Sequence, residues 1–140
     1  MKKLDLDQVA DEFDIISGET HLFYNTETEE FDWYNEYADM EDDDPEQFDE
    51  DCWVAAPSQY DINEYAIMER FAESVEDTRS SELLQVALNG KGAFRRFKDT
   101  LQIIGLADAW YAFRHEAFVE IARDWCIQND LPYVESDTRK

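Results

Sequence analysis

The segment from Glu36 to Asp51 constrains this chain more than any other feature, because it holds ten carboxylates among sixteen residues and no basic side chain. Carboxylates without cationic partners cannot be moved out of water together, since each would lose its hydration without compensation. The segment is therefore predicted to be a solvated acidic loop.

This loop belongs to a wider asymmetry of charge. The first sixty residues carry twenty acidic and two basic side chains, and the remaining eighty carry fifteen acidic and ten basic ones. The net charge of −23 repels phosphate, so neither bare nucleic acid nor an anionic membrane surface is an expected partner. Another protein is the expected partner, and a basic surface on it is electrostatically favoured. The oligomeric state stays open.

The cysteines and the N-terminal residues indicate in which cellular compartment the protein is expected. Cys52 and Cys126 lie in no CxxC or Cys/His spacing, so reduced thiols in a cytoplasmic protein are predicted, with a single disulfide as the alternative. The first residues carry acids where a secretion signal needs an apolar run. No stretch reaches the ~20 apolar residues that a membrane span needs.

The N-terminal part reads as one short helix followed by a small antiparallel sheet. Leu4–Phe13 has helical spacing of its apolar residues. Thr20–Tyr24 and Phe31–Tyr34 are rich in aromatic residues and flank a turn that starts at Asn25, which predicts a β-hairpin. Trp53–Ala56 is predicted to add a third strand, which makes the acidic run the loop between the second and third strands.

From Tyr60 onward the pattern becomes helical. Asp61 with Glu64 three residues later resembles a capping box. Four helices are predicted, over about 60–75, 80–88, 92–104 and 106–129, with an extended segment at 131–134. The third helix is predicted to bury Phe94, Phe97, Leu101 and Ile104, and the fourth to bury Trp110, Phe113, Ala117, Ile121 and Trp125.

These elements predict an α+β fold with a short N-terminal helix, a sheet of two to three strands and a C-terminal bundle of about four helices. A chain of 140 residues is predicted to form a single domain. Within it, residues 1–58 make the acidic helix-and-sheet part, which contains the loop 36–51, and residues 59–140 make the helical part.

The most distinctive segment is GKGAFRRFKD at residues 90–99. Two glycines precede a helix whose free N–H groups point toward its start, which is a common geometry for holding an anion. The segment is not a P-loop, because GxxxxGK[ST] is absent. The candidate anion-binding residues are Gly90, Lys91, Gly92, Arg95, Arg96 and Lys98.

A structural role for the same residues remains open. Gly90 would end the preceding helix, Gly92 would let two backbones approach closely, and the cations would neutralise carboxylates of this chain. Arg95 has the spacing to pair with Asp99 on the same helix face.

Catalytic and metal-binding patterns are weak. Only His21 and His115 are available as imidazole bases, and neither lies in a recognised motif, so no catalytic residue is predicted. Glu41–Asp44 followed by Pro45 lacks the glycine of an EF-hand loop, so neither a metal nor a cofactor is predicted. The acidic run also suggests a mimic of nucleic acid, with carboxylates in place of phosphates.

Several segments together resemble the bacterial Uncharacterised Protein Family 0158. They are Tyr60–Glu69, GKGAFRRFKD at 90–99, Trp110–Arg114 and Ile121–Cys126, so the resemblance covers mainly residues 55–130, with a looser match in the hairpin. The resemblance implies a small cytoplasmic bacterial protein, and it transfers no catalytic residue. The acidic run before Cys52 is expected to be a variable portion outside it.

The sequence therefore favours a non-enzymatic binding or regulatory module that accepts an anionic group at the cluster after Gly90. The alternatives are an acidic mimic of nucleic acid that binds a basic protein, and a small enzyme that acts on a phosphate-bearing substrate.

Overall fold

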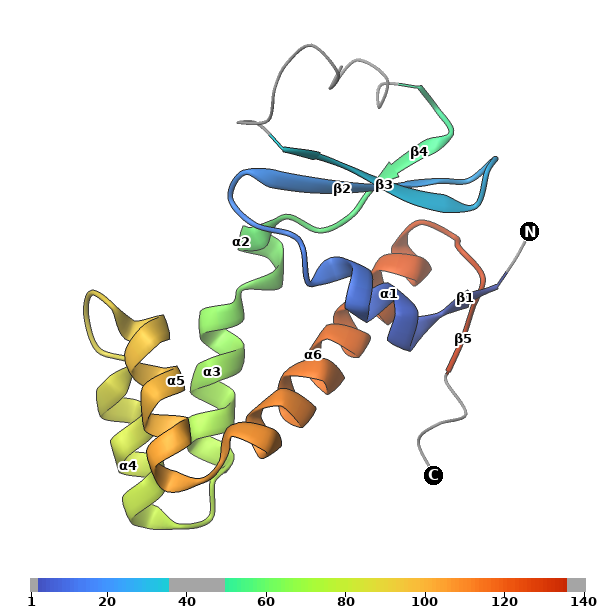
Figure 1. The fold of residues 1–140 in the computed structure, drawn as a ribbon. Coiled ribbons are helices and arrows are strands. Elements are labelled where there is room, and N and C mark those ends of the chain that lie inside the picture. The colour runs from blue at the N-terminus through green and yellow to red at the C-terminus, as the bar shows by residue number, and fades with distance from the viewer. Residues whose placement is uncertain (1–2, 36–49, 136–140) are drawn as a thin grey trace. The chain divides into compact units, whose positions relative to one another are not determined.

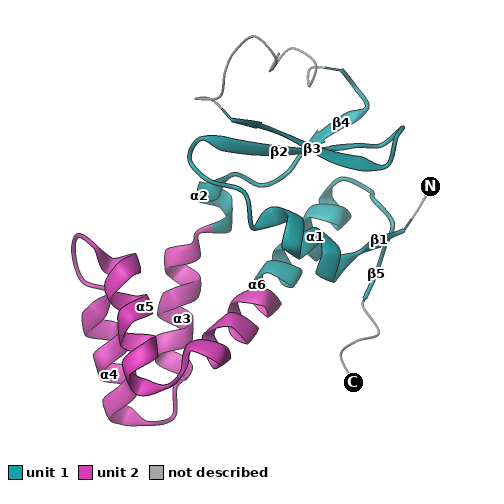
Figure 2. Cartoon of the chain, in the orientation of Figure 1, with its two compact units in different colours: residues 1–62, 118–140 teal, residues 63–117 magenta. Residues whose placement is uncertain are grey.

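The computed structural model describes residues 3–35 and 50–135, so most of the predicted acidic loop, residues 36–49, lies outside the described residues. The chain divides into two compact units, which are described separately (Figure 2). Unit 1 comprises residues 1–62 and 118–140, and unit 2 comprises residues 63–117. The α+β fold class is confirmed, whereas the single domain stays a prediction.

Unit 1 contains the sheet, which is formed by β2 (Thr20–Asn25), β3 (Glu30–Asn35) and β4 (Trp53–Ala55). The strand order is β3-β2-β4, and both pairings are antiparallel (Figure 1). The predicted third strand thus joins the open side of β2. A separate two-stranded pair runs parallel, with Leu4 opposite Tyr133. The elements are β1 (Leu4–Asp5), α1 (Leu6–Phe13), β2 (Thr20–Asn25), β3 (Glu30–Asn35), β4 (Trp53–Ala55), α2 (Gln59–Ile62), the end of α6 (Ala107–Gln128) and β5 (Tyr133–Val134).

The hairpin turn is organised by Asn25, as its position predicts. Its side-chain oxygen accepts hydrogen bonds from the backbone N–H groups of Glu27 and Thr28, at 2.8 and 3.0 Å. Glu29 takes a positive φ of 60° so that β3 can turn back alongside β2. The backbone N–H of Thr26 donates to the carbonyl of Cys52, which ties the turn to the start of β4.

Trp125, near the end of α6, is the centre of the unit 1 core. Its ring lies 5.4 Å from that of Phe13, 6.2 Å from that of Tyr24 and 6.1 Å from that of Phe31, measured between centroids. Its indole N–H donates to the carbonyl of Ala55 at 2.8 Å. One side chain therefore connects α1, α6 and all three strands of the sheet.

The start of the helical region differs from the prediction that Asp61 begins a helix capped with Glu64. The reciprocal capping pair is Ser58 with Asp61, whose side chains each accept the other's backbone N–H at 3.1 Å. This pair begins the short helix α2. Asn63 then adopts a left-handed conformation and caps α3 (Glu64–Ser74) through its side chain. One predicted helix is therefore two.

Unit 2 is the helical part, formed by α3, α4 (Thr78–Ala87), α5 (Ala93–Ile104) and the first part of α6. Its core is aromatic: the Trp110 ring lies 5.5 Å from Phe71 and 5.0 Å from Phe97, edge to face. Arg114 of α6 pairs with Glu64 at the start of α3. The helices end within two residues of the predicted positions.

One assignment of the sequence analysis is wrong, and one grouping differs from the two compact units. Phe94 was placed in the buried stripe of α5, but it is 45% exposed. Phe97 and Leu101 of that stripe are buried. Residues 118–140 were placed with the helical part, whereas they belong to unit 1. The reason is Trp125, which packs against the hairpin and α1 instead of the bundle.

The Trp125 hydrogen bond gives a stability prediction. Trp125→Phe should lower the free energy of unfolding by about 2 kcal/mol, because Ala55 loses its donor and the ring shrinks. Tyr24→Phe is the matched comparison, since the buried Tyr24 hydroxyl has no hydrogen-bond partner. That change should leave stability unchanged or raise it by about 1 kcal/mol. Urea unfolding measures both, and equal losses would contradict this account.

Candidate functional site

Arg96 is the most extensively bonded residue of the predicted basic cluster. Its Nε donates to the carbonyl of Ala87 at 3.1 Å, and its terminal nitrogens donate to the carbonyls of Asn89 and Lys91. These carbonyls belong to the end of α4 and to the turn that leads into α5. A cation at a helix C-terminus satisfies carbonyls that have no partner within the helix. Arg96 thus holds the α4–α5 turn.

The two glycines of this turn both take left-handed backbone conformations, with φ of 78° at Gly90 and 76° at Gly92. Such values strain residues that carry a Cβ. A Cβ at Gly92 would also lie 3.3 Å from a terminal nitrogen of Arg96. The close neighbour of Gly92 is therefore the Arg96 guanidinium, and not a second backbone as the sequence analysis considered.

Lys91, Arg95 and Lys98 differ from Arg96 in their partners, because none of the three forms a side-chain hydrogen bond within the described residues. All three are exposed, as Arg96 is. Lys91 lies on the turn before α5, and Arg95 and Lys98 lie in its first two turns. Within the described part of the chain, none of the three forms an ion pair with a carboxylate. The pair between Arg95 and Asp99 that the spacing allows is not formed. We call these three residues the α5 basic cluster.

The start of α5 adds two features to this cluster. Its N-cap is Gly92, so no side chain caps the first N–H groups of the helix, which form its positive end. Phe94 lies between the cations and is 45% exposed. The sequence analysis missed Phe94 because its spacing fits the buried stripe of the helix equally well. The site is therefore a basic surface with an aromatic side chain.

The other candidates for chemistry lie apart from this cluster. The His21 ring stacks on Tyr34 in the sheet, with centroids 6.5 Å apart. Cys52 and Cys126 are free thiols, and burial raises the pKa of Cys126 to about 11, which opposes thiolate formation. Among residues 3–35 and 50–135 no group of three or more His, Cys, Asp or Glu side chains is placed to hold a metal ion.

The bonds of Arg96 generate a prediction. Arg96→Ala should lower the free energy of unfolding by about 1–2 kcal/mol, because carbonyls around the α4–α5 turn lose a charged donor. Arg96→Lys should recover only part of the loss, since an ammonium lacks the planar fork of a guanidinium. Arg95→Ala is the control and should change stability by less than about 0.5 kcal/mol. Urea denaturation measures all three, and equal losses for Arg95 and Arg96 would contradict the distinction.

None of the helices described, from α1 to α6, is long and apolar enough to cross a membrane. No curated protein and no solved structure matches the chain. A family model does match, over residues 5–138, so the match extends through the acidic run that was expected to lie outside it. With nearly its whole length covered, the chain belongs to the Uncharacterised protein family (UPF0158).

Proposed function

We propose that this protein is a non-enzymatic binding or regulatory module that accepts an anionic group of a partner protein at the α5 basic cluster. The observation that carries the proposal is that these three cations form no ion pair with a carboxylate of the described residues. The chain has 35 carboxylates, yet none of those described pairs with Lys91, Arg95 or Lys98. Because these three cations are not paired with the described carboxylates, they can bind an external anion.

The local charge supports this proposal. Unit 2 carries nine acidic and seven basic side chains, a net charge of −2, so unit 1 carries −21 of the total −23. Exposed charges further apart than about 8 Å are largely screened at physiological salt. An acidic segment of a partner protein would therefore be attracted by the α5 basic cluster, and the rest of unit 2 would repel it only weakly.

Phe94 and the start of α5 indicate what kind of anionic group would fit. The exposed ring offers apolar contact beside the cations. The uncapped N–H groups at the helix start can donate to a carboxylate or a phosphate oxygen. A short acidic peptide that carries an apolar side chain matches both features. Arg96 supports the site indirectly, because its bond to the Lys91 carbonyl holds the turn on which Lys91 lies.

Charge reversal tests the proposal. Arg95→Glu/Lys98→Glu should weaken the binding of a fluorescent polyglutamate probe at least about tenfold, which corresponds to about 1.4 kcal/mol. Lys3→Glu/Arg70→Glu is the matched control, because it changes net charge equally at two exposed positions outside the α5 basic cluster. The control should retain most of the affinity. Fluorescence anisotropy at two salt concentrations measures both, and equal weakening would show only a general charge effect.

A second candidate function rests on the charge of unit 1. A net −21 over 85 residues favours a basic protein partner, to which the unit would act as a mimic of nucleic acid. Part of this charge, namely Asp5, Glu12, Glu29 and Glu30, lines one hollow of about 310 Å³ between α1 and the hairpin turn, which Lys3 also lines.

Displacement of DNA from polylysine tests this second function. The wild-type chain should release a fluorescent duplex from polylysine, and the release should fall as salt rises. Glu12→Gln/Glu29→Gln/Glu30→Gln should weaken the release more than Glu69→Gln/Glu73→Gln/Glu82→Gln, the matched change on α3 and α4 of unit 2. Equal effects, or no release by the wild-type chain, would count against the mimic.

A further inference from the structure

An apolar pocket of about 530 Å³ lies at the end of unit 2 where α3 gives way to α4 and α5 gives way to α6. Most of its wall is hydrocarbon, and its polar groups come from the α3–α4 turn and the first turn of α4. The lining residues are Phe71, Ser74, Val75, Glu76, Asp77, Ser80, Ile104, Leu106 and Ala109. The pocket is distinct from the α5 basic cluster, which lies at the other end of α5.

An exposed isoleucine lies next in sequence to a residue that lines this pocket. Ile103 is 83% exposed, and it directly precedes Ile104, which lines the pocket. Leu83 of α4 is also 40% exposed. A side chain as apolar as isoleucine is stabilised by removal from water, and the pocket offers an apolar surface of suitable size. The same end of unit 2 therefore presents both a projecting apolar side chain and a receptor for one.

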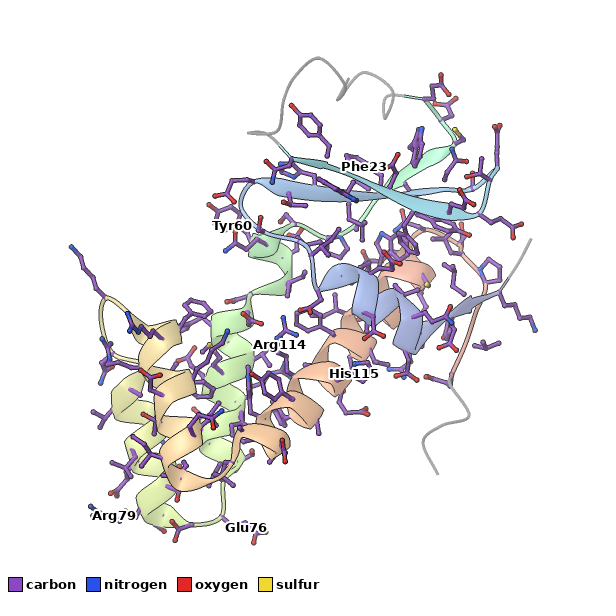
Figure 3. All side chains as sticks on the ribbon, in the orientation of Figure 1. Phe23, Tyr60, Glu76, Arg79, Arg114 and His115 are labelled. Carbon is purple, nitrogen blue, oxygen red and sulfur yellow. The ribbon has the colours of Figure 1, made fainter. Side chains whose placement is uncertain are left out.

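The charges at this end are also complementary. Glu76 lines the pocket and Arg79 lies one residue before the lining Ser80, and both extend from the same end of unit 2 (Figure 3). Neither side chain forms an ion pair within the described residues. Asp77 between them is occupied as the cap of α4, where bonds from Ser80, aided by the Arg79 charge, lower its pKa.

These features fit a second copy of this chain better than an unrelated partner. In a two-fold interface the same surface occurs on both sides, so a projecting group and its receptor must both lie on the patch that the two copies share. Ile103 with the pocket, and Glu76 with Arg79, both meet that condition. Unit 2 also carries a net charge of only −2, so two such units meet without the repulsion that the −21 of unit 1 would cause.

We propose that this end of unit 2 is a two-fold dimer interface in which Ile103 of each copy enters the pocket of the other. Glu76 of each copy pairs with Arg79 of the partner, so the contact contains two equivalent ion pairs. The interface leaves the α5 basic cluster uncovered, and a dimer therefore presents two such clusters.

The oligomeric state of the full chain tests this proposal by sedimentation velocity over a range of concentrations. The wild-type chain should dimerise, and Ile103→Asp should weaken dimerisation at least about 100-fold, because a charge would enter an apolar pocket. Val86→Asp is the matched control, since Val86 is 66% exposed on α4 and lines no part of this pocket. It should dimerise like the wild type.

A charge swap separates the interface from any effect on folding. Glu76→Arg and Arg79→Glu should each weaken dimerisation about tenfold, because each places like charges opposite one another twice. The double variant should recover the wild-type dimer, since both pairs form again with reversed sign. A wild-type chain that stays monomeric would assign the pocket to another occupant and overturn the proposal. So would a dimer that is unaffected by Ile103→Asp, or a double variant that shows no recovery.

Discussion

The contact between the Trp125 indole and the carbonyl of Ala55 holds unit 1 together. A hairpin is marginally stable in water by itself, and β4 adds only three residues to it. The sheet therefore depends on a layer packed against one face, and Trp125 supplies the centre of that layer through its contacts with Phe13, Tyr24 and Phe31. Its hydrogen bond also fixes where β4 lies, because Ala55 is the last residue of that strand.

This contact explains why α6 serves two cores. Trp110, near the start of the helix, packs among Phe71 and Phe97 in unit 2. Trp125, about four turns later, packs in unit 1. The charge is divided unevenly between the two units that α6 contributes to. Unit 1 holds 26 of the 35 carboxylates, whereas the charges of unit 2 nearly cancel. An anionic partner or a second copy of the chain is therefore expected to bind unit 2, because its small net charge repels either of them less than unit 1 would.

Much of the fold follows from local sequence signals. The aromatic runs around Asn25 predict the hairpin, since the turn is determined by a side chain that bonds its own backbone. The helix boundaries follow from caps and glycines. The β1–β5 pair has no such signal, because two residues are too few to show alternation. The position of residues 118–140 could not be predicted either, because helical periodicity does not say which core a buried face will join.

The candidate site shows the same limit at the level of single side chains. Arg95 and Arg96 are adjacent and chemically identical, and both follow the same glycine turn, so sequence spacing cannot distinguish them. The left-handed turn brings the carbonyls of Ala87, Asn89 and Lys91 around one guanidinium only. Arg95 lies one helical step, about 100°, away around α5 and makes none of these bonds.

That division has a consequence for what the basic cluster can do. If the cations of α5 existed only to balance the charge of this chain, they would be expected to pair with its carboxylates, which outnumber basic side chains by 35 to 12. Instead, Arg96 binds backbone carbonyls, which a lysine or a neutral donor would satisfy less completely. The turn it stabilises carries Lys91 and leads into the helix that carries Arg95 and Lys98. The structural residue and the exposed cations are therefore parts of one arrangement, in which Arg96 maintains the surface that the other three present.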